Sequence, residues 1–554
     1  MVEPRLRAMA REHPFDTSAH CHTRQATEGP CENSPTSRQC WGQHSINTDW
    51  YEVVPETGAT REYWLNAELI KLAPDGYEVA VLALNGSMPG PLIEADWGDE
   101  VVVHVTNNIE TNGTAIHWHG IHQRNTNAHD GVPGVTQCPT APGKTTTYRF
   151  RATQYGTSWY HSHFSLQLAM VLGPLVIHGP ATANYDVDLG PLVLMDWFHG
   201  SVFHIWETTQ RVVALHQPNQ CARSTDPRCK GTGERFEFDQ PFEPGKKYLI
   251  RLIGSQTDGY FKPAIDGHKL PGQRYDVIVE AKPTTANSRG RYWMRAIYQT
   301  ACNFNDNDSK GNILGIVRYA GADTSPAAVP TTAKARTITN SCEDEPYESL
   351  TPWLQHDVGP AKVSDRLRVA WYYELDLVYH WTINTKTLIV NWSDPTVLDV
   401  HRAGAGQQQP PLPLKFPRNS NVWVIEDRTL VNVWYPMHLH GHDFYVLAQG
   451  RGPFVPGLVR LNTKNPPRRD TVSLYGTGYT VITFKTDNPG AWLMHCHIAW
   501  HASQGLSLQL LARAGELSQQ IGGDAVQLAA MDDTCADWKA WYPTSPYHQD
   551  NSGI

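Results

Sequence analysis

Long apolar runs are absent from this chain of 554 residues. The longest are short pieces such as Val79–Leu84 and Leu506–Leu511, whereas a membrane-spanning helix needs roughly 20 apolar residues. Runs of one charge are missing too, because 46 basic and 55 acidic residues are interspersed and give a formal net charge of -9. Nucleic-acid binding needs clustered basic charge. We therefore expect neither a membrane nor a nucleic acid as partner.

Helical periodicity is scarce before a stretch at Glu516–Met531. Short runs rich in β-branched and aromatic residues dominate instead, and 43 Gly and 39 Pro separate them. Such runs, flanked by Gly, Pro, Asn or Asp, are typical of strands. Examples are Glu100–Val105, Thr145–Arg151, Lys247–Ile253 and Tyr479–Lys485. The pattern predicts all-β sandwiches with a helical C-terminal tail.

The chain is too long for a single core, since cores stop growing near roughly 250–300 residues. Composition changes near Gly179–Asn184 and in an Ala-Pro-Thr-rich stretch at Gly321–Arg336 indicate boundaries. We expect an N-terminal extension or pro-segment, then three β domains, then a tail. Their ranges are 1–44, 45–180, 181–330, 331–515 and 516–554.

An apolar signal-peptide core is missing from Met1–His20, which is polar and charged. Ten cysteines nevertheless favour an oxidising compartment. Four glycosylation sequons agree with export, at Asn85, Asn112, Asn307 and Asn391. Either the leader has been removed or is incorrectly given, or export follows another route. We favour the former and expect a secreted protein.

Histidines two residues apart form the strongest pattern. Random placement of 26 His would give roughly one such pair, but six occur, counting His440/His442 and His20/His22. Four lie in strand-like contexts: His117/His119, His161/His163, His438/His440 and His495/His497. Each pair aims two imidazoles from one strand face. A lone His is usually satisfied by a backbone carbonyl, but this ensemble predicts a metal centre built on Zn, Cu, Fe or Ni.

Cys496 lies between His495 and His497 and therefore points to the opposite strand face. His501 follows five residues later. A thiolate with imidazole is typical of a blue-copper electron-transfer site. One strand would then hold a mononuclear copper on one face and a polynuclear cluster on the other, joined through a few covalent bonds.

Four longer stretches contain these residues. They are His117-Trp118-His119-Gly120, Ser158-Trp159-Tyr160-His161-Ser162-His163-Phe164, Pro436-Met437-His438-Leu439-His440-Gly441-His442-Asp443 and Ala491-Trp492-Leu493-Met494-His495-Cys496-His497-Ile498-Ala499-Trp500-His501. The chain resembles the multicopper oxidases over roughly residues 28–554, and the ascomycete-type laccases in particular. The resemblance implies three cupredoxin-like Greek-key β-sandwich domains. It also implies a monomer that oxidises small phenols of the benzenediol type, or aromatic amines, and reduces O₂ to water.

The resemblance further implies four copper ions, one of type 1, one of type 2 and two of type 3. His117 and His438 look like type 2 ligands. Type 3 ligands would be His119, His161, His163, His440, His495 and His497. Cys496 and His501 match type 1 ligands. Leu506 falls at the axial position of type 1 copper, where an apolar side chain withholds a donor and raises the potential.

Softer matches follow from the same resemblance. Asp130 resembles an acid that delivers protons to the oxygen cluster, although Asp130-Gly131 equally suits an ordinary turn. Asp258 resembles a substrate-pocket carboxylate that accepts the phenolic proton. The tail Asn551–Ile554 resembles a C-terminal plug. Expected disulfides are Cys31–Cys40, Cys138–Cys535, Cys302–Cys342 and Cys221–Cys229. This leaves Cys21, which we place in a disordered terminus.

Two features depart from the family pattern. Tyr435 stands where a second type 1 histidine is expected, and its odd number puts it on the Cys496 side of an extended strand. A phenol with a pKa of about 10 is a doubtful ligand. In addition, Asp266-Gly267-His268 runs almost at once into Gly272-Gln273-Arg274, where such laccases carry another strand pair. A skipped exon would explain this gap, and a genuine gap would leave sheet edges unpaired near the substrate pocket.

Three functions compete. The first is a laccase-like oxidase acting on lignin fragments, melanin precursors or secondary-metabolite phenols. The second is a degenerate copper-binding homologue with an impaired type 1 site and little oxidase activity. The third, a structural zinc protein, fails on ligand number, since a structural zinc site closes with four ligands.

Overall fold

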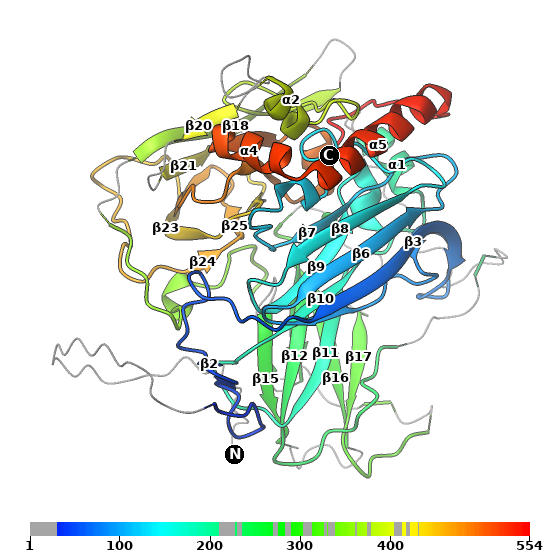
Figure 1. Cartoon of the computed structure of the whole chain (residues 1–554). Helices are drawn as coiled ribbons and strands as arrows, with labels where there is room; N and C mark the ends of the chain where they lie inside the picture. Colours follow the sequence, from blue (N-terminus) through cyan, green and yellow to red (C-terminus); the bar gives the residue numbers. More distant parts are fainter. Residues whose placement is uncertain are drawn as a thin grey trace.

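The structure is a computed structural model. It describes residues 30–554 except 210–227, 230–234, 267, 270–274, 283–289, 303–312, 326–328, 331–337, 360–362, 374–377, 404–412, 417–420 and 430. Within this part, six large sheets pair into three sandwiches. Figure 1 shows the green strands of the second sandwich below the blue and cyan strands of the first, with the orange strands of the third beside them. The predicted all-β class is confirmed.

The first sandwich joins two four-stranded sheets, β4-β3-β6-β8 and β5-β10-β9-β7. Its strands are β3 (Thr60–Leu72), β4 (Val79–Leu84), β5 (Ile93–Asp96), β6 (Glu100–Asn107), β7 (Ile116–His119), β8 (Thr145–Arg151), β9 (Gly156–Ser162) and β10 (Leu172–His178). In β6, Val101, Val103 and Val105 are buried, whereas His104 and Thr106 are partly exposed. Val102 is buried too, so burial alternates from Val103 to Asn107, with the two-residue period of a strand.

A small sheet of β1 (Cys40–Trp41) and β2 (His44–Ser45) precedes the first sandwich. It ends at Ser45, one residue beyond the expected N-terminal extension at 1–44. The Arg38 amide and guanidinium donate to Asn184 and Tyr185, which places this segment against the start of the second sandwich. Residues 1–29, with Cys21 and the His20/His22 pair, lie outside the described part.

The second sandwich has a three-stranded sheet, β11-β12-β15, and a four-stranded sheet, β14-β13-β16-β17. Its elements are β11 (Val187–Leu194), α1 (Val202–Thr209), β12 (Lys247–Gly254), β13 (Phe261–Ile265), β14 (His268–Lys269), β15 (Tyr275–Glu280), β16 (Arg291–Tyr298) and β17 (Leu314–Arg318). β14 and β15 are both edge strands, and they flank the shortened segment noted in the sequence. Residues 270–274 between them lie outside the described part.

The third sandwich has sheets β19-β18-β21-β26-β23-β24 and β20-β28-β27-β22-β25. Its elements are η4 (Tyr347–Ser349), β18 (Val363–Tyr373), β19 (Tyr379–Ile383), α2 (Thr396–Ala403), β20 (Pro413–Phe416), β21 (Asn421–Asp427), β22 (Tyr435–Leu439), β23 (Phe444–Arg451), β24 (Arg468–Arg469), β25 (Thr471–Leu474), β26 (Gly478–Phe484), β27 (Gly490–Cys496), α3 (Ala499–Ser503) and β28 (Ser507–Ala512). All residues of β27 are buried, because β22 and β28 flank it and both of its faces are covered.

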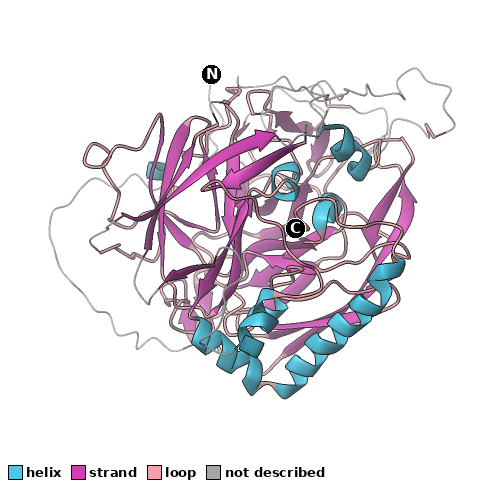
Figure 2. Ribbon diagram, turned by 90° about the horizontal axis from the view of Figure 1, so that it is seen from above, coloured by secondary structure: helices cyan, strands magenta, loops and turns pink. Residues whose placement is uncertain are grey.

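The C-terminal tail is helical as predicted, but the expected single stretch is divided into α4 (Ala514–Gly523) and α5 (Ala525–Trp541), followed by η5 (Tyr542–Thr544). Gly522 and Gly523 end α4, and the Asp524 carboxylate accepts the Gln527 amide at 2.9 Å to cap α5. Two glycines before a capping residue are the physical reason for the break. Figure 2 shows the longest helix along one side of the molecule, outside the strands.

A hydrophobic cluster joins the first sandwich, the third sandwich and the tail. It includes Val132 from the first, Leu493 from β27, Trp538 from α5 and the terminal Ile554. The Cys138–Cys535 disulfide links the same parts, and the structure also contains Cys31–Cys40 and Cys302–Cys342. The expected Cys221–Cys229 pair involves Cys221, which is outside the described residues. This cluster fixes the first and third sandwiches against each other.

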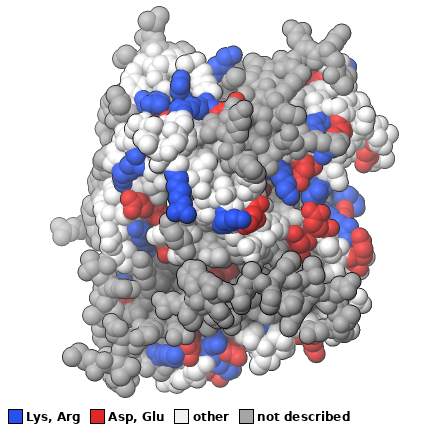
Figure 3. All heavy atoms as spheres, turned by 90° about the vertical axis from the view of Figure 1, so that its left-hand side faces the viewer, with Lys and Arg blue, Asp and Glu red and all other residues white. Residues whose placement is uncertain are grey.

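Charges of both signs are intermixed on the face of the molecule drawn in Figure 3, without a continuous basic area among its described residues. None of the helices in the described part combines the length and the apolar character that crossing a bilayer requires.

Candidate metal centre

The four histidine pairs come from two pairs of neighbouring strands. In the first sandwich β7 pairs with β9, with His117 opposite His161. In the third sandwich β22 pairs with β27, with His438 opposite His495. His119, His163, His440 and His497 complete the set from these strands or the turns that follow them. Antiparallel register therefore places two pairs side by side in each sandwich.

The two sandwiches bring their histidines together face to face. The rings of His117 and His440 stack with centroids 3.9 Å apart, and those of His119 and His438 are also 3.9 Å apart. Across the group, Nε2 of His495 lies 3.4 Å from Nε2 of His163 and 3.2 Å from Nε2 of His440. All eight side chains are buried. The structure thus places the four pairs in one shared cluster.

The cluster contains three groups of three histidines whose ligand atoms lie within 4.8 Å of one another. They are His117/His119/His161, His117/His438/His440 and His163/His440/His495. His117 belongs to two of these groups and so does His440, so the three groups form one site that could hold several metal ions. A two- or three-metal site built from shared neighbours needs this arrangement.

Burial keeps five of these imidazoles neutral. It lowers the pKa of His161, His163, His438, His440 and His495 well below the ordinary value, and neighbouring histidines lower it further. A neutral imidazole has a free lone pair for a metal, whereas a protonated one does not. The cluster is therefore chemically ready to bind cations at neutral pH.

Hydrogen bonds fix the ring orientation of four of these histidines. Nδ1 of His161, His438, His495 and His117 each lies 2.8–2.9 Å from a backbone carbonyl oxygen. A carbonyl only accepts, so Nδ1 must donate and the Nε2 lone pair faces the cluster. Nε2 of His117, His161 and His438 is buried with no hydrogen-bond partner among the described residues. Orphaned buried acceptors aimed at one another fit a bound metal.

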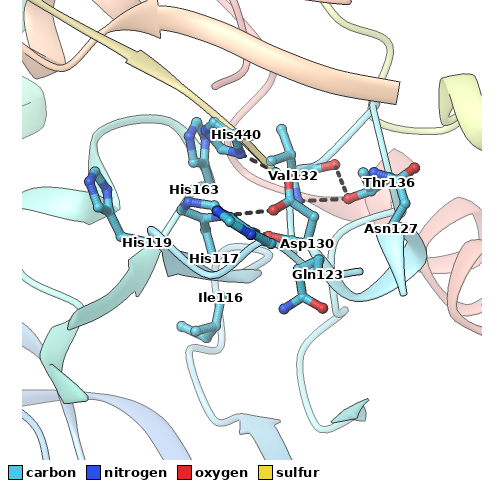
Figure 4. Close-up of polar contacts among 12 residues, drawn as sticks. Ile116, His117, His119, Gln123, Asn127, Asp130, Val132, Thr136, His163 and His440 are labelled. Atoms are coloured by element: carbon cyan, nitrogen blue, oxygen red, sulfur yellow. Dashed lines mark hydrogen bonds and ion pairs between the residues drawn. The ribbon is translucent and has the colours of Figure 1, made fainter. Parts of the chain in front are cut away.

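Asp130 joins the two halves of the cluster. Its fully buried carboxylate lies 2.8 Å from Nδ1 of His440 and 3.2 Å from Nδ1 of His117. Figure 4 shows it between these two rings. Gly131 follows at φ +82°, and a Cβ there would meet the Ile116 carbonyl at 1.7 Å. Glycine is thus required for the tight approach, which agrees with the turn that the sequence also allowed.

Asp470 is a cluster residue that the sequence analysis did not identify. Its carboxylate lies 3.7 Å from Nε2 of His119, and its carbonyl accepts Nδ1 of His438 at 2.8 Å. It precedes β25, whose Thr471 lies opposite His438 in β22. No local spacing marks Asp470, because its proximity arises only from pairing between two distant strands.

His129 lies beside Asp130 and contacts the C-terminal helix. Its Nε2 is 2.9 Å from Nε2 of Gln527 in α5. Burial lowers the pKa of His129 to about 4, so the folded protein holds this ring neutral. The unfolded chain takes up a proton at a pKa of about 6.5. Stability contributed by neutral His129 is therefore lost as the pH falls from about 6.5 towards 4.

We expect His129→Gln to reduce this pH dependence. Between pH 7 and pH 5 the natural chain should lose up to about 2 kcal/mol more free energy of unfolding than the variant. Urea titrations followed by tryptophan fluorescence at both pH values measure the difference. His104→Gln, at a partly exposed histidine on the outer face of β6, is the control. An equal loss in H129Q and the natural chain would contradict the assignment.

Cys496 faces away from the histidine cluster. It lies opposite Met437 in β22 and packs in a core with Tyr435 and Leu506. Its sulfur is 3.4 Å from Nδ1 of His501. Burial raises the pKa of the Cys496 thiol and lowers that of His501 to about 3. The strand thus separates a sulfur–imidazole pair on one side from His495 and His497 on the other.

Tyr435 lies on the Cys496 side. Its ring centroid is 5.5 Å from that of His501, and its hydroxyl is 3.2 Å from the Thr429 hydroxyl. The side chain is fully buried. This side of β27 therefore offers one thiol, one imidazole and one phenol. A blue-copper site has two imidazoles and a thiolate, so the donor set fits such a site only in part.

Asp258 lies in the loop between β12 and β13, close enough to Cys496 for its charge to raise the pKa of the thiol. The preceding residue, Thr257, accepts the Ala499 amide at 3.0 Å, and Ala499 begins the helix that carries His501. The structure therefore places the Asp258 loop beside α3, on the side of β27 where Cys496 and His501 lie.

The C-terminal residues lie against the segment that follows His163 and against α3, which carries His501. Ser552 donates its amide to Ser503 in α3 at 2.8 Å, and Asn551 donates to the Ser165 hydroxyl at 2.6 Å. The terminal Ile554 is 1% exposed. The last four residues therefore pack between the segment after His163 and the helix of His501.

Comparison with known proteins gives consistent findings. A family model described as "Multicopper oxidase" matches residues 66–182, and a second model with the same description matches residues 389–516. "Oxidoreductase OpS5" of Beauveria bassiana is 48% identical over 95% of this chain and 93% of its own length. "Laccase-2" of Botryotinia fuckeliana is 44% identical, covering 96% of this chain and 95% of its own.

A solved structure of the laccase from Botrytis aclada matches with a TM-score of 0.87. It is 44% identical and covers 95% of this chain and 100% of its own. The match confirms the expected arrangement of cupredoxin-like sandwiches.

Proposed function

This chain belongs to the multicopper oxidase family and is of the ascomycete laccase type, and we propose that it oxidises small phenols or aromatic amines with dioxygen as the electron acceptor. Members of this family bind copper. The observation that carries the proposal is the cluster of eight buried histidines, three of them with an orphaned Nε2. Relatives named as laccases support the oxidase.

We assign the copper ligands by matching each residue to the family motif. His117 and His438 would hold type 2 copper. The type 3 pair would be held by His119, His161, His163, His440, His495 and His497. Copper held by these residues would relay four electrons, taken one at a time from four phenol molecules, to one O₂, which is reduced to two waters. The contacts of His117 and His440 with Asp130 support a role for this acid in supplying protons to that site.

The chain's own residues would prepare the phenol for oxidation. A phenol docked beside His501 would pass its proton to the Asp258 carboxylate as it loses one electron. Cys496 supplies the covalent connection from this side to His495 and His497. Leu506 is buried beside Cys496 and offers no donor, which agrees with its expected axial position. His501 is buried, so water is largely excluded from its imidazole ring, beside which the phenol would dock.

A second candidate function rests on Tyr435. Its hydroxyl is hydrogen-bonded to Thr429 in a sealed core, and a phenol of ordinary pKa is a poor donor at neutral pH. In this second function, the degenerate homologue, the chain binds copper at the histidine cluster but accepts electrons from substrates only slowly. We favour the oxidase because the complete cluster, and the fold around it, are kept.

Secretion and a monomeric state remain part of the proposal. Three disulfides in the described part agree with an oxidising compartment.

We expect the copper-loaded natural chain to consume oxygen with 2,6-dimethoxyphenol and to release water without hydrogen peroxide. An oxygen electrode, a peroxide assay and metal analysis measure this together. The control is His161→Ala, which removes one cluster ligand and should abolish uptake while leaving the Cys496 side intact. Copper-loaded protein that consumes no oxygen with any phenol or diamine would contradict the oxidase and favour the degenerate homologue.

A further inference from the structure

One carboxylate organises the loop that carries Asp258. Asp196 lies just after β11, and its Oδ2 accepts three consecutive backbone amides, those of Thr257, Asp258 and Gly259, at 3.0, 2.9 and 2.8 Å. Successive amides that converge on one anion form a nest. The carboxylate therefore determines the path of the backbone on both sides of Asp258.

The nest is sterically specific. A Cβ at Gly259 would lie 2.4 Å from Oδ1 of Asp196, so a larger residue would displace the carboxylate. Burial raises the pKa of Asp196, while the three amides lower it. The pKa stays raised overall, so the amides offset only part of the cost of burying this charge. Hydrogen bonds to a charged acceptor are roughly twice as strong as neutral ones.

The same loop is fixed to the helix of His501. The Thr257 carbonyl accepts the Ala499 amide at 3.0 Å, and the Ser255 amide donates to the Leu194 carbonyl at 2.9 Å. The loop is thus attached to β11 through Ser255 and to α3 through Thr257. Asp196 lies between these two attachments, so the distance from Asp258 to His501 depends on it.

We infer that Asp196 is a positioning residue, which holds the Asp258 carboxylate at the substrate side of His501 so that it can accept the phenolic proton. This inference rests on the proposed oxidation of phenols. It assigns a function in substrate recognition to a residue whose hydrogen bonds, within the described part of the chain, reach backbone amides of the Asp258 loop and not the histidine cluster or Cys496.

The test compares an electron donor that also loses a proton on oxidation, a phenol, with one that loses only an electron, ferrocyanide. In Asp196→Asn and Asp196→Ala, kcat/KM for 2,6-dimethoxyphenol should fall about tenfold or more, as expected when hydrogen bonds to a charged group are lost. Oxidation of ferrocyanide, which loses only an electron, should stay within about twofold. The pH profile for the phenol should change in the same direction as in Asp258→Asn.

The dissociation constant of the phenol, measured by calorimetry, gives a readout that needs no turnover. It should rise in D196N, D196A and D258N. The control is Asp186→Asn, because Asp186 also accepts a backbone amide, that of Lys247 at 2.7 Å, but at an exposed turn. D186N should change neither binding nor rates.

The outcomes separate the inference from the function on which it rests. If D258N weakens the phenol and D196N does not, the inference is wrong and the proposed function stands. If D196N slows ferrocyanide as much as the phenol, Asp196 is only structural and the inference is again wrong. If D258N itself changes nothing, the proton-accepting role fails and the inference fails with it.

Discussion

Tyr435→His should oxidise phenols at least about tenfold faster than the natural chain, and it should gain an intense absorption band at about 600 nm once loaded with copper. The reason is the donor set beside Cys496, which has one imidazole where a blue-copper site has two. Histidine at this position would complete the set. The absorption spectrum reports the sulfur–copper bond directly, and oxygen uptake reports the rate.

The surrounding structure allows this substitution. β22 places Tyr435 on the same face as Met437, which lies opposite Cys496, so a histidine at 435 would also face the sulfur. Imidazole is smaller than phenol and requires no expansion of the core. Thr429 loses its contact with the Tyr435 hydroxyl, but its own hydroxyl still accepts the Val431 amide at 3.2 Å and donates to the Val431 carbonyl at 3.4 Å. The Thr429 hydroxyl is therefore not left without a partner.

Tyr435→Phe is the matched control, because it removes the same hydroxyl but adds no nitrogen. It should show neither the band nor a faster rate. If the natural chain already has the full band, and the histidine variant is no faster, then Tyr435 does not limit the enzyme. That result would overturn our account of this departure and remove the basis for the degenerate alternative.

The histidine pairs were predictable because strand periodicity is local. On a strand, residues two apart share a face, so each pair's common direction, and the opposite direction of Cys496, follow from residue numbers alone. The structure adds what parity cannot supply, namely which pairs meet. His117 and His440 are 323 residues apart along the chain. Their rings stack because of how the first and third sandwiches pack, which no local pattern predicts.

Asp470 and Asp196 were missed for a related reason. Asp470 reaches His119 only because β25 pairs with β22. Asp196 acts through backbone amides, and an amide carries no residue identity that a sequence pattern could detect. By contrast, Asp130 was identifiable from its family motif, and its carboxylate contacts histidines from both halves of the cluster.

Two substitutions of Asp130 should separate the two functions proposed for its carboxylate, which are to orient the His440 ring and to supply protons. The Nδ1–H of His440 donates to its Oδ2 at 2.8 Å, while His117 has a second acceptor in the Asp130 carbonyl at 2.8 Å. Asp130→Asn can still offer its one amide oxygen to His440. It therefore keeps the rings oriented but loses the charge and the capacity to carry a proton.

We expect Asp130→Asn to retain its copper but to reduce oxygen on the order of ten- to a hundredfold more slowly, with the largest defect where protons are scarce, at high pH. Asp130→Ala removes the acceptor of His440 as well and should lose copper affinity on the order of ten- to a hundredfold. Metal analysis after dialysis and oxygen uptake at saturating phenol measure the two effects separately.

Asp99→Asn is the control for burying a neutral amide in place of a charge. Asp99 is 1% exposed and pairs with Arg61 at 2.7 Å in the first sandwich, among none of the cluster residues. It should lower stability without changing oxygen reduction in the remaining folded protein. A D130N enzyme as fast as the natural one at every pH would exclude Asp130 from proton supply, and full copper retention in D130A would exclude it from orienting His440.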